Sequence, residues 1–177
     1  MKYNEMTWGQ MEAVINKLGG MDGVHRFLSG ESVVKTVEHF IDCDADPFVP
    51  SGWTVESHKK GGQFAFNPAK VNLHLSPNQQ GGEHIEGNKL HKKLANEPVL
   101  NANVLDFLLK NPTLIPEEWK RDASGNIRYI FFWGTIYHSD GGLCVRYLHW
   151  GGGSWRWGSS WLDDDWLGSS PAAVLAS

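Results

Sequence analysis

The spacing of hydrophobic residues is helical in the first 30 positions. In "TWGQMEAVINKLGG" they recur every three or four residues, which is the period of one helix face. Thr7 can cap this segment in a capping box with Gln10, and Gly19 can end it. "MDGVHRFLSG" follows, with Asp22 as its cap and Gly30 as its end. The pattern predicts two short helices in this part of the chain.

A second helical region is predicted between about residues 85 and 119. "IEGNKLHKKLANEP" indicates a modest helix, and "VLNANVLDFLLKNP" indicates a stronger one in which apolar residues recur every four positions. Asn101 can cap the stronger helix. Asp106 and Lys110 are one turn apart on it, so they are expected to form an ion pair along its surface.

Strand-like patterns fill the rest of the chain. The β-branched run in "ESVVKTVEHFIDCDAD" favours a strand, and "GGQFAFNPAKVNLHLS" indicates two short strands around an Asn67-Pro68 turn. The aromatic-rich segment "IRYIFFWGTIYHSDGGLCVRYLHWGGGSWRWGSSW" contains Asp140-Gly141 and Gly152-Gly153, the residues favoured in two-residue hairpin turns. We therefore predict an α+β fold with short helices on a mainly antiparallel sheet, built around a three-stranded meander over about residues 128 to 158.

The two predicted turns determine which side chains of the meander share a face, because side chains alternate along a strand. One face is predicted to carry Phe131, Trp133, Thr135 and Tyr137 opposite Trp150, Leu148, Arg146 and Cys144, with Trp155 against Trp150 and Trp157 against Leu148. The other face is predicted to carry Phe132, Gly134, Ile136 and His138 opposite His149, Tyr147, Val145 and Leu143. Both faces are partly apolar, which leaves two interpretations open.

In the first interpretation the meander is core, with helices over one face and strands from residues 33 to 75 over the other. In the second, the tryptophans form an exposed platform with an arginine as its polar anchor. Tryptophan rings on a sheet stack on sugars, bases or proline-rich peptides. The candidate ligand-binding residues are then Trp133, Arg146, Trp150, Trp155 and Trp157.

Composition narrows the function classes. The chain has 177 residues, nine of them tryptophan, and is 41% hydrophobic and 20% charged, which suits one globular domain over residues 1–177. A net charge of -4 argues against a general nucleic-acid-binding protein. Two cysteines without a C-x-x-C argue against a disulfide framework or a thiolate zinc site. The start has no apolar signal-peptide core and no run is long enough for a membrane span, so a cytoplasmic protein without a membrane partner is expected.

Three aspartates alternate in "IDCDADPFVP". Asp42, Asp44 and Asp46 would point to one side of a strand, and carboxylate oxygens are ligands that divalent cations prefer. The segment resembles the start of a calcium-binding loop, but Pro47 stands where that loop needs glycine and Trp53 where it needs a bidentate acid. The alternative is a solvated strand edge, or a turn whose carboxylates cap backbone N–H groups.

"HFIDCDADP" also resembles the Asp-x-Asp motif of haloacid-dehalogenase-type phosphotransferases. The resemblance implies an aspartate nucleophile, a second aspartate acting as acid and base, and a distal acidic pair that holds magnesium. Asp163, Asp164 and Asp165 are candidates for that pair. The family also has a doubly wound parallel sheet, and the middle of this chain lacks the alternating strand–helix pattern that such a sheet requires.

Five longer stretches resemble a single family. They are "IDCDADPFVPSGWTVESHKKGGQF", "IEGNKL", "PVLNANVLDFLLKNPTLIPEEWK", "FFWGTIYHSDGGLCVRYLHW" and "PAAVLAS". Over most of the chain they are similar to a family of short hypothetical proteins from bacterial genomes. The resemblance implies no activity, ligand or fold, and it carries no site residue to this chain.

The sequence therefore predicts a non-enzymatic binding or interaction protein that uses the tryptophan-rich sheet, with a carbohydrate, a peptide or a protein as candidate ligand. The alternative is a divalent-metal-dependent hydrolase or phosphotransferase that uses Asp42, Asp44 and Asp46. A structural part of a larger assembly is a third interpretation, and the sequence identifies no cofactor.

Overall fold

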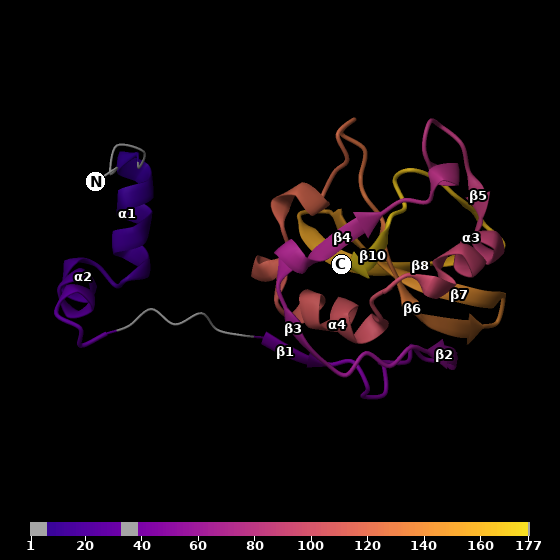
Figure 1. Cartoon of the computed structure of the whole chain (residues 1–177), viewed down its shortest axis with the longest axis horizontal. Helices are drawn as coiled ribbons and strands as arrows, with labels where there is room; N and C mark the ends of the chain where they lie inside the picture. Colours follow the sequence, from indigo (N-terminus) through magenta and orange to yellow (C-terminus); the bar gives the residue numbers. More distant parts are fainter. Residues whose placement is uncertain (1–6, 33–38, 177) are drawn as a thin grey trace. The chain divides into compact units, whose positions relative to one another are not determined.

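The computed structural model describes residues 7–32 and 39–176. The chain divides into two compact units, Met1–Glu38 and His39–Ser177. Figure 1 shows the helices of the smaller unit and the sheet and helices of the larger one. The expectation of one domain over residues 1–177 stays a prediction.

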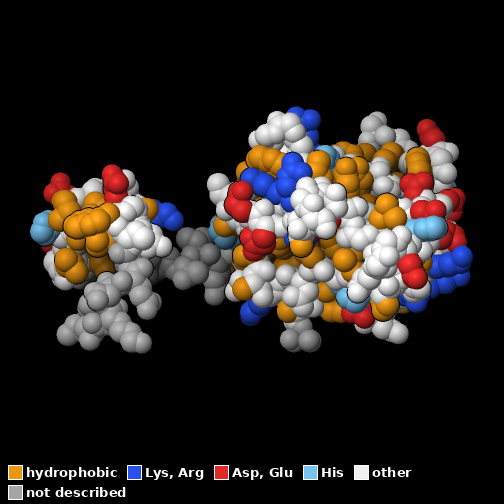
Figure 2. Space-filling model, turned by 90° about the horizontal axis from the view of Figure 1, so that it is seen from above, with side chains coloured by type: hydrophobic (Ala, Val, Ile, Leu, Met, Phe, Trp, Pro, Cys, Tyr) orange, Lys and Arg blue, Asp and Glu red, His pale blue; other side chains and the backbone are white. Residues whose placement is uncertain are grey.

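The smaller unit is a pair of helices, α1 (Trp8–Lys17) and α2 (Met21–Leu28). The predicted capping box is confirmed, since the Thr7 side chain accepts from the Gln10 N–H and the Gln10 side chain accepts from the Thr7 N–H. α2 begins directly after Gly20, so Asp22 lies in its first turn instead of capping it as expected. Hydrophobic side chains gather on the visible face of this unit in Figure 2. The exposed ones are Trp8, Met11, Val14, Met21, Phe27 and Leu28.

The larger unit contains ten strands and two α-helices in its described residues. In chain order these are β1 (His39–Asp42), β2 (Thr54–His58), β3 (Gln63–Phe66), β4 (Val71–His74), β5 (Ile85–Glu86), α3 (Gly87–Lys93), α4 (Ala102–Lys110), β6 (Ile130–Ser139), β7 (Gly142–Gly151), β8 (Ser154–Trp161), β9 (Asp165–Trp166) and β10 (Ala172–Leu175). Short 3₁₀ turns lie at residues 68–70, 77–79, 94–96, 112–114 and 117–119. The expected strand from residue 33 is described only from His39 onward, since residues 33–38 lie outside the described part.

One six-stranded sheet organises the larger unit. Its strand order is β4-β10-β6-β7-β8. β2 is the sixth strand: it pairs with β6 on the same edge as β10, but further along the strand. Of the strand pairs that the described residues form in this sheet, β10–β6 is parallel and the others are antiparallel. β1–β3 and β5–β9 form two separate antiparallel ribbons. The predicted α+β class is confirmed, and the doubly wound parallel sheet of the phosphotransferase family is not formed by the described residues.

The predicted meander is β6, β7 and β8. β6 ends at Ser139 and β7 begins at Gly142, which places the first turn at residues 140–141. Gly152 and Gly153 form the second turn, with φ of 60° and 80°, a left-handed conformation that glycine adopts without strain. The register of β7 and β8 is the predicted one along its whole length, from Cys144 opposite Trp161 to Trp150 opposite Trp155.

The register of β6 and β7 is as predicted only near their turn. Tyr137 lies opposite Cys144, but Phe131 lies opposite Tyr147 instead of Trp150. β6 therefore has three more residues than β7 between these pairs, and an odd offset moves side chains to the other face. The shift arises because Gly134 forms its backbone hydrogen bonds with other segments instead of with β7. Its N–H donates to Leu100 O (2.9 Å), and its carbonyl accepts from Lys59 N (2.6 Å).

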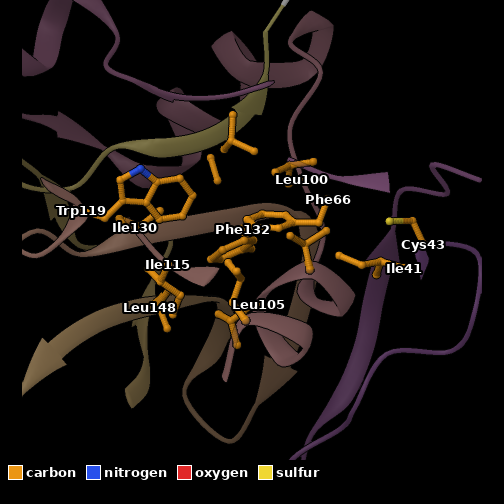
Figure 3. Close-up of a cluster of buried hydrophobic side chains, with 14 residues drawn as sticks. Ile41, Cys43, Phe66, Leu100, Leu105, Ile115, Trp119, Ile130, Phe132 and Leu148 are labelled. Carbon is orange, nitrogen blue, oxygen red and sulfur yellow. The ribbon is translucent and has the colours of Figure 1, made fainter. Parts of the chain in front are cut away.

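Both faces of the sheet are covered, but helices and strands are divided between the faces differently from the expectation. α4 and the β1–β3 ribbon lie on one face, where Leu105 packs with Phe132 and Leu148 in the core shown in Figure 3. α3 and the segment around Leu162 and Trp166 cover the other. We expected helices on one face and strands from residues 33 to 75 on the other; helices instead lie on both faces, and the β1–β3 ribbon shares its face with α4.

Tyr147 also differs from the expectation. The sequence predicts it opposite Gly134. Its partner glycine is Gly158 on β8, where a Cβ would come within 2.5 Å of the tyrosine ring. Gly134 instead lies against the backbone of Asn101 at the start of α4.

Candidate functional site

Arg146, the predicted polar anchor, is buried in the middle of β7. It lies opposite Ser159, and only 1% of it is exposed. Its guanidinium makes a bidentate ion pair with Asp106 on α4, with Nη2–Oδ1 at 2.7 Å and Nη1–Oδ2 at 3.1 Å. The expected Asp106–Lys110 pair is therefore replaced by a contact across the core face. Arg146 cannot offer this guanidinium edge to a ligand while Asp106 occupies it.

Two aromatic rings cover the face of the same guanidinium. Its carbon lies 4.4 Å from the ring centre of Trp157 and 5.2 Å from that of Phe48. Trp157 also makes edge contacts, with Phe48 at 6.4 Å and with Trp53 at 6.3 Å between ring centres. We call Phe48, Trp53 and Trp157 the aromatic surface. The buried cation holds its rings in place through cation–π attraction.

The aromatic surface is held by contacts on its inner side and is exposed on its outer side. The Tyr137 hydroxyl donates to the Phe48 carbonyl at 3.0 Å, which ties the loop after β1 to β6. Tyr137 also packs edge-on against Trp53. Phe48 is nevertheless 54% exposed and Trp157 39% exposed. Large rings held rigidly and left open are typical of interaction sites.

The other predicted platform tryptophans do not share this exposure. Trp150 and Trp155 are half-buried and pack edge-on at 5.5 Å, and Lys120 Nζ lies 3.6 Å from the Trp150 ring centre. Trp133 is only 3% exposed and lies on the opposite face of the sheet, packed against Trp166. The expectation that Trp133 shares the face of Trp157 was wrong, because the register shift in β6 turns it over.

The three predicted metal ligands are exposed: Asp42 is the last residue of β1, and Asp44 and Asp46 lie in the turn after it. Asp42 Oδ1 accepts from the N–H groups of Asp44 (2.9 Å) and Ala45 (3.2 Å), and Asp44 Oδ1 accepts from Gly62 N (2.9 Å). Within residues 7–32 and 39–176, no group of three or more acidic, histidine or cysteine side chains is arranged to hold a metal ion. Asp42 and Asp44 thus have the capping role of the alternative interpretation, and metal binding by Asp42, Asp44 and Asp46 stays a prediction.

A buried polar network that the sequence does not indicate lies near the start of α4. Asn101 Nδ2 donates to the carbonyls of Cys43 (2.8 Å) and Lys59 (3.0 Å). His58 contacts Thr135 Oγ1 through Nδ1 (2.8 Å) and Cys43 O through Nε2 (3.2 Å). These bonds join β1, β2, β6 and α4. Only the helix-cap position of Asn101 was visible in the sequence, because its partners are far apart in the chain.

The network brings a cysteine, a histidine and an asparagine together, but its chemistry is structural. His58 contacts the backbone carbonyl of Cys43, and no hydrogen bond joins it to the thiol among the described residues. Burial, with smaller contributions from Asp42 and Asp44, raises the pKa of the Cys43 thiol to about 11. A nucleophilic cysteine needs a lowered pKa, so this arrangement does not suit covalent catalysis.

A pocket of about 220 Å³ lies between β2, β6 and α3. Its lining includes His58, His91 and Trp133. His91 stacks on Trp133 with the ring planes 18° apart, and burial lowers the pKa of His91. His58 is occupied by the network above, so the pocket does not present a paired acid and base.

Comparison with known proteins yields no assignment. No protein-family model matches the chain, and neither a curated protein nor a solved structure is similar to it. Membership of the family of short hypothetical bacterial proteins therefore stays a prediction. In the part of the chain that the structure describes, no helix is both long and apolar enough to cross a membrane.

Proposed function

We propose that this protein is a binding or interaction protein that uses the aromatic surface of Phe48, Trp53 and Trp157. The observation that carries the proposal is the combination of exposure and rigidity at Trp157. Trp157 is 39% exposed, yet its ring is packed on the fully buried Arg146, which is paired with the partly buried Asp106. A ring fixed in this way loses little conformational entropy when a ligand covers it.

The chemistry of the surface supports flat or extended ligands. Phe48 and Trp157 present apolar rings, while the charge beneath them is neutralised by Asp106. Such a surface favours stacking over charge recognition, as in aromatic sites for carbohydrates and proline-rich peptides. We propose a carbohydrate, a peptide or a protein segment as the ligand, and we leave Trp133 out of the site because it is buried on the other face.

The first experiment tests whether the surface is open. Acrylamide quenching of the native protein should decrease when Trp157 is replaced by phenylalanine, because an accessible indole is removed. Trp8→Phe, at an 86% exposed position in the smaller unit, is the matched control for loss of an exposed indole. Identical quenching of the wild type and the Trp157→Phe variant, in protein dilute enough to be monomeric, would show that the ring is covered within one chain, and the proposal would fail.

The second experiment tests binding. A glycan array and a proline-rich peptide array are probed with the wild type, Trp157→Ala and Trp8→Ala. We expect hits that lose at least tenfold in affinity in Trp157→Ala, as expected for loss of about 1.4 kcal/mol or more of stacking, and that are unchanged in Trp8→Ala. Hits that are equally strong in all three proteins would place the binding site elsewhere.

The cytoplasmic location stays a prediction.

The alternative function, a metal-dependent hydrolase or phosphotransferase, is not supported by a specific contact. Calorimetry with magnesium, manganese and calcium on the wild type and on an Asp42→Asn, Asp44→Asn variant separates the two functions. Heat of binding that the double variant abolishes would favour the hydrolase or phosphotransferase interpretation.

A further inference from the structure

β8 is the outermost strand of the sheet, and its hydrogen-bonding groups divide cleanly between two sides. Among the strands of residues 7–32 and 39–176 it pairs only with β7, in an unbroken antiparallel register. Just beyond β8, Leu162 N donates to Leu143 O on the β7 side. N–H and C=O groups alternate sides from one residue to the next in an antiparallel strand. The even-numbered residues of β8 therefore bond β7, and the odd-numbered ones point to the open edge.

Trp161 confirms this alternation. Its N–H does not point to β7 but donates to Asp164 Oδ2 at 3.0 Å, so the carboxyl end of the edge is closed by a side chain. The outward groups of Trp155, Trp157 and Ser159 have no backbone partner among the described residues. A row of three residues with free N–H and C=O groups is a template for a further strand.

β8 also lacks the features that prevent the edge strand of one sheet from pairing with another strand. It is eight residues long, without proline, without a shift in its register to β7, and with Arg156 as its only charge. Natural edge strands are usually shortened, bulged or charged to prevent pairing. On this edge the exposed Trp157 side chain adds apolar area next to the free backbone groups.

We propose that a second copy of this chain pairs with this edge, β8 against β8 in antiparallel orientation, with Trp157 opposite its counterpart on a two-fold axis. In that register Trp155 lies opposite Ser159, so odd-numbered residues face odd-numbered residues and their outward groups can bond. The same register brings the two Trp157 rings together and joins the two aromatic surfaces. The inference does not rest on the proposed ligand binding.

Charge complementarity favours a second copy over another extended segment. The turn after β8 carries Asp163, Asp164 and Asp165. In the proposed register it lies beside the Gly152 turn of the other copy. Arg156 folds toward that turn, with a guanidinium nitrogen 2.9 Å from where a Cβ of Gly152 would be, and it has no acidic partner among the described residues. Each end of the paired strands would thus join an acidic turn to an arginine.

A single proline tests the pairing. Ser159→Pro removes an outward N–H without removing a bond to β7, so the fold should persist as judged by near-ultraviolet circular dichroism. Ser159→Ala, which keeps the N–H, is the matched control. Sedimentation equilibrium of the full chain should show a concentration-dependent dimer for the wild type and Ser159→Ala, and a monomer for Ser159→Pro. Arg156→Glu should weaken the dimer, and high salt should weaken the wild-type dimer.

Amide hydrogen exchange gives a readout that needs no variant. The amides of Trp155, Trp157 and Ser159 should exchange fast in dilute protein and slowly in concentrated protein. Those of Gly158 and Ser160 should be slow in both. A wild type that is monomeric at every concentration overturns the proposal, as does a dimer that survives in Ser159→Pro. Protection of the three amides in dilute monomer would also overturn it, since another part of the chain would then cover the edge.

If ligand binding fails but the dimer forms, only the proposed function is lost. If Trp157→Ala abolishes ligand binding while the wild type is monomeric, the proposed function stands and the pairing is wrong. The two proposals can therefore be judged independently.

Discussion

The guanidinium of Arg146 lies between the carboxylate of Asp106 and the rings of Phe48 and Trp157. At the residue scale, this one group explains why the aromatic surface is rigid. A planar cation can donate two hydrogen bonds from its edge and stack against two rings at the same time. Lysine could not hold the three partners in this geometry.

We predict that Asp106→Ala lowers the free energy of unfolding by about 3 kcal/mol, because it leaves a buried guanidinium without its counter-ion. Lys110→Ala, which removes the partner expected from the sequence, should change it by less than about 0.5 kcal/mol. Urea denaturation of the two variants measures both values. Similar effects of the two substitutions would contradict the observed pairing.

Asp42 provides a second test at this scale. Asp42→Ala should cost about 1 kcal/mol, because two backbone N–H groups lose their acceptor, whereas Asp42→Asn keeps an acceptor oxygen and should cost less. Thermal unfolding of both variants checks this order. A rise in wild-type melting temperature with magnesium, manganese or calcium that Asp42→Asn abolishes would instead show a metal site.

At the scale of elements, the decisive feature is the register shift in β6. The segment around Gly134 leaves β7 and bonds Leu100 and Lys59 instead. This allows the start of α4 to approach the sheet closely, and it moves Trp133 to the face that α3 covers. The hairpin turns could be predicted because glycine and aspartate at these positions favour them locally. The shift could not, since it depends on partners 34 and 75 residues earlier in the chain.

Gly134→Ala tests this contact. A Cβ at Gly134 would come within 2.9 Å of the N, Cα and Cβ atoms of Asn101, and backbone atoms cannot move aside cheaply. We expect a loss of about 2–3 kcal/mol in the stability of the larger unit. Gly9→Ala, where a Cβ meets nothing within 4 Å, is the control and should leave the unfolding of the larger unit unchanged. A fully stable Gly134→Ala variant would contradict the packing of α4 on β6.

The packing of α3 on the sheet predicts a pH dependence. Burial lowers the pKa of His91 below its ordinary value of 6.5. At a pH between the lowered pKa of His91 in the folded protein and its ordinary pKa in the unfolded chain, the unfolded chain binds more protons. The free energy of unfolding should therefore fall as the pH drops from about 7 through this range. His91→Gln should reduce this slope. Burial, with a smaller contribution from Arg156, lowers the pKa of His149 as well, so His149→Gln should reduce the slope further. Denaturation curves at several pH values between about 5 and 7.5 give the slopes, and an unchanged slope in the double variant would contradict this account.

At the scale of the whole molecule, the larger unit has a complete core of its own. α4 and the β1–β3 ribbon close one face of the sheet, and α3 with the Leu162–Trp166 segment closes the other. The smaller unit has no buried residue in α1, and its hydrophobic stripe is exposed as described. We therefore expect residues 39–177 to fold without the first helices as a cover for this core.

We predict that a chain of residues 39–177 keeps the cooperative thermal unfolding and the near-ultraviolet circular dichroism of the full protein. The tryptophans of the core clusters, including Trp119 and Trp166, all lie within it. Loss of the cooperative transition in this shorter chain would show that the two units stabilise each other. It would then support the expectation of a single domain over residues 1–177.

The sequence alone determined the α+β class, the two hairpin turns and the pairing of β7 with β8, because these follow from local periodicity and from the conformational preferences of glycine. It also identified Trp157 as a candidate for ligand binding. Only the tertiary structure decided which aromatic rings remain open. Exposure depends on what packs above each ring, and the covering segments come from α3, α4 and the loop after β1. For the same reason the sequence could propose Arg146 as a free anchor, whereas Asp106, 40 positions away, occupies it.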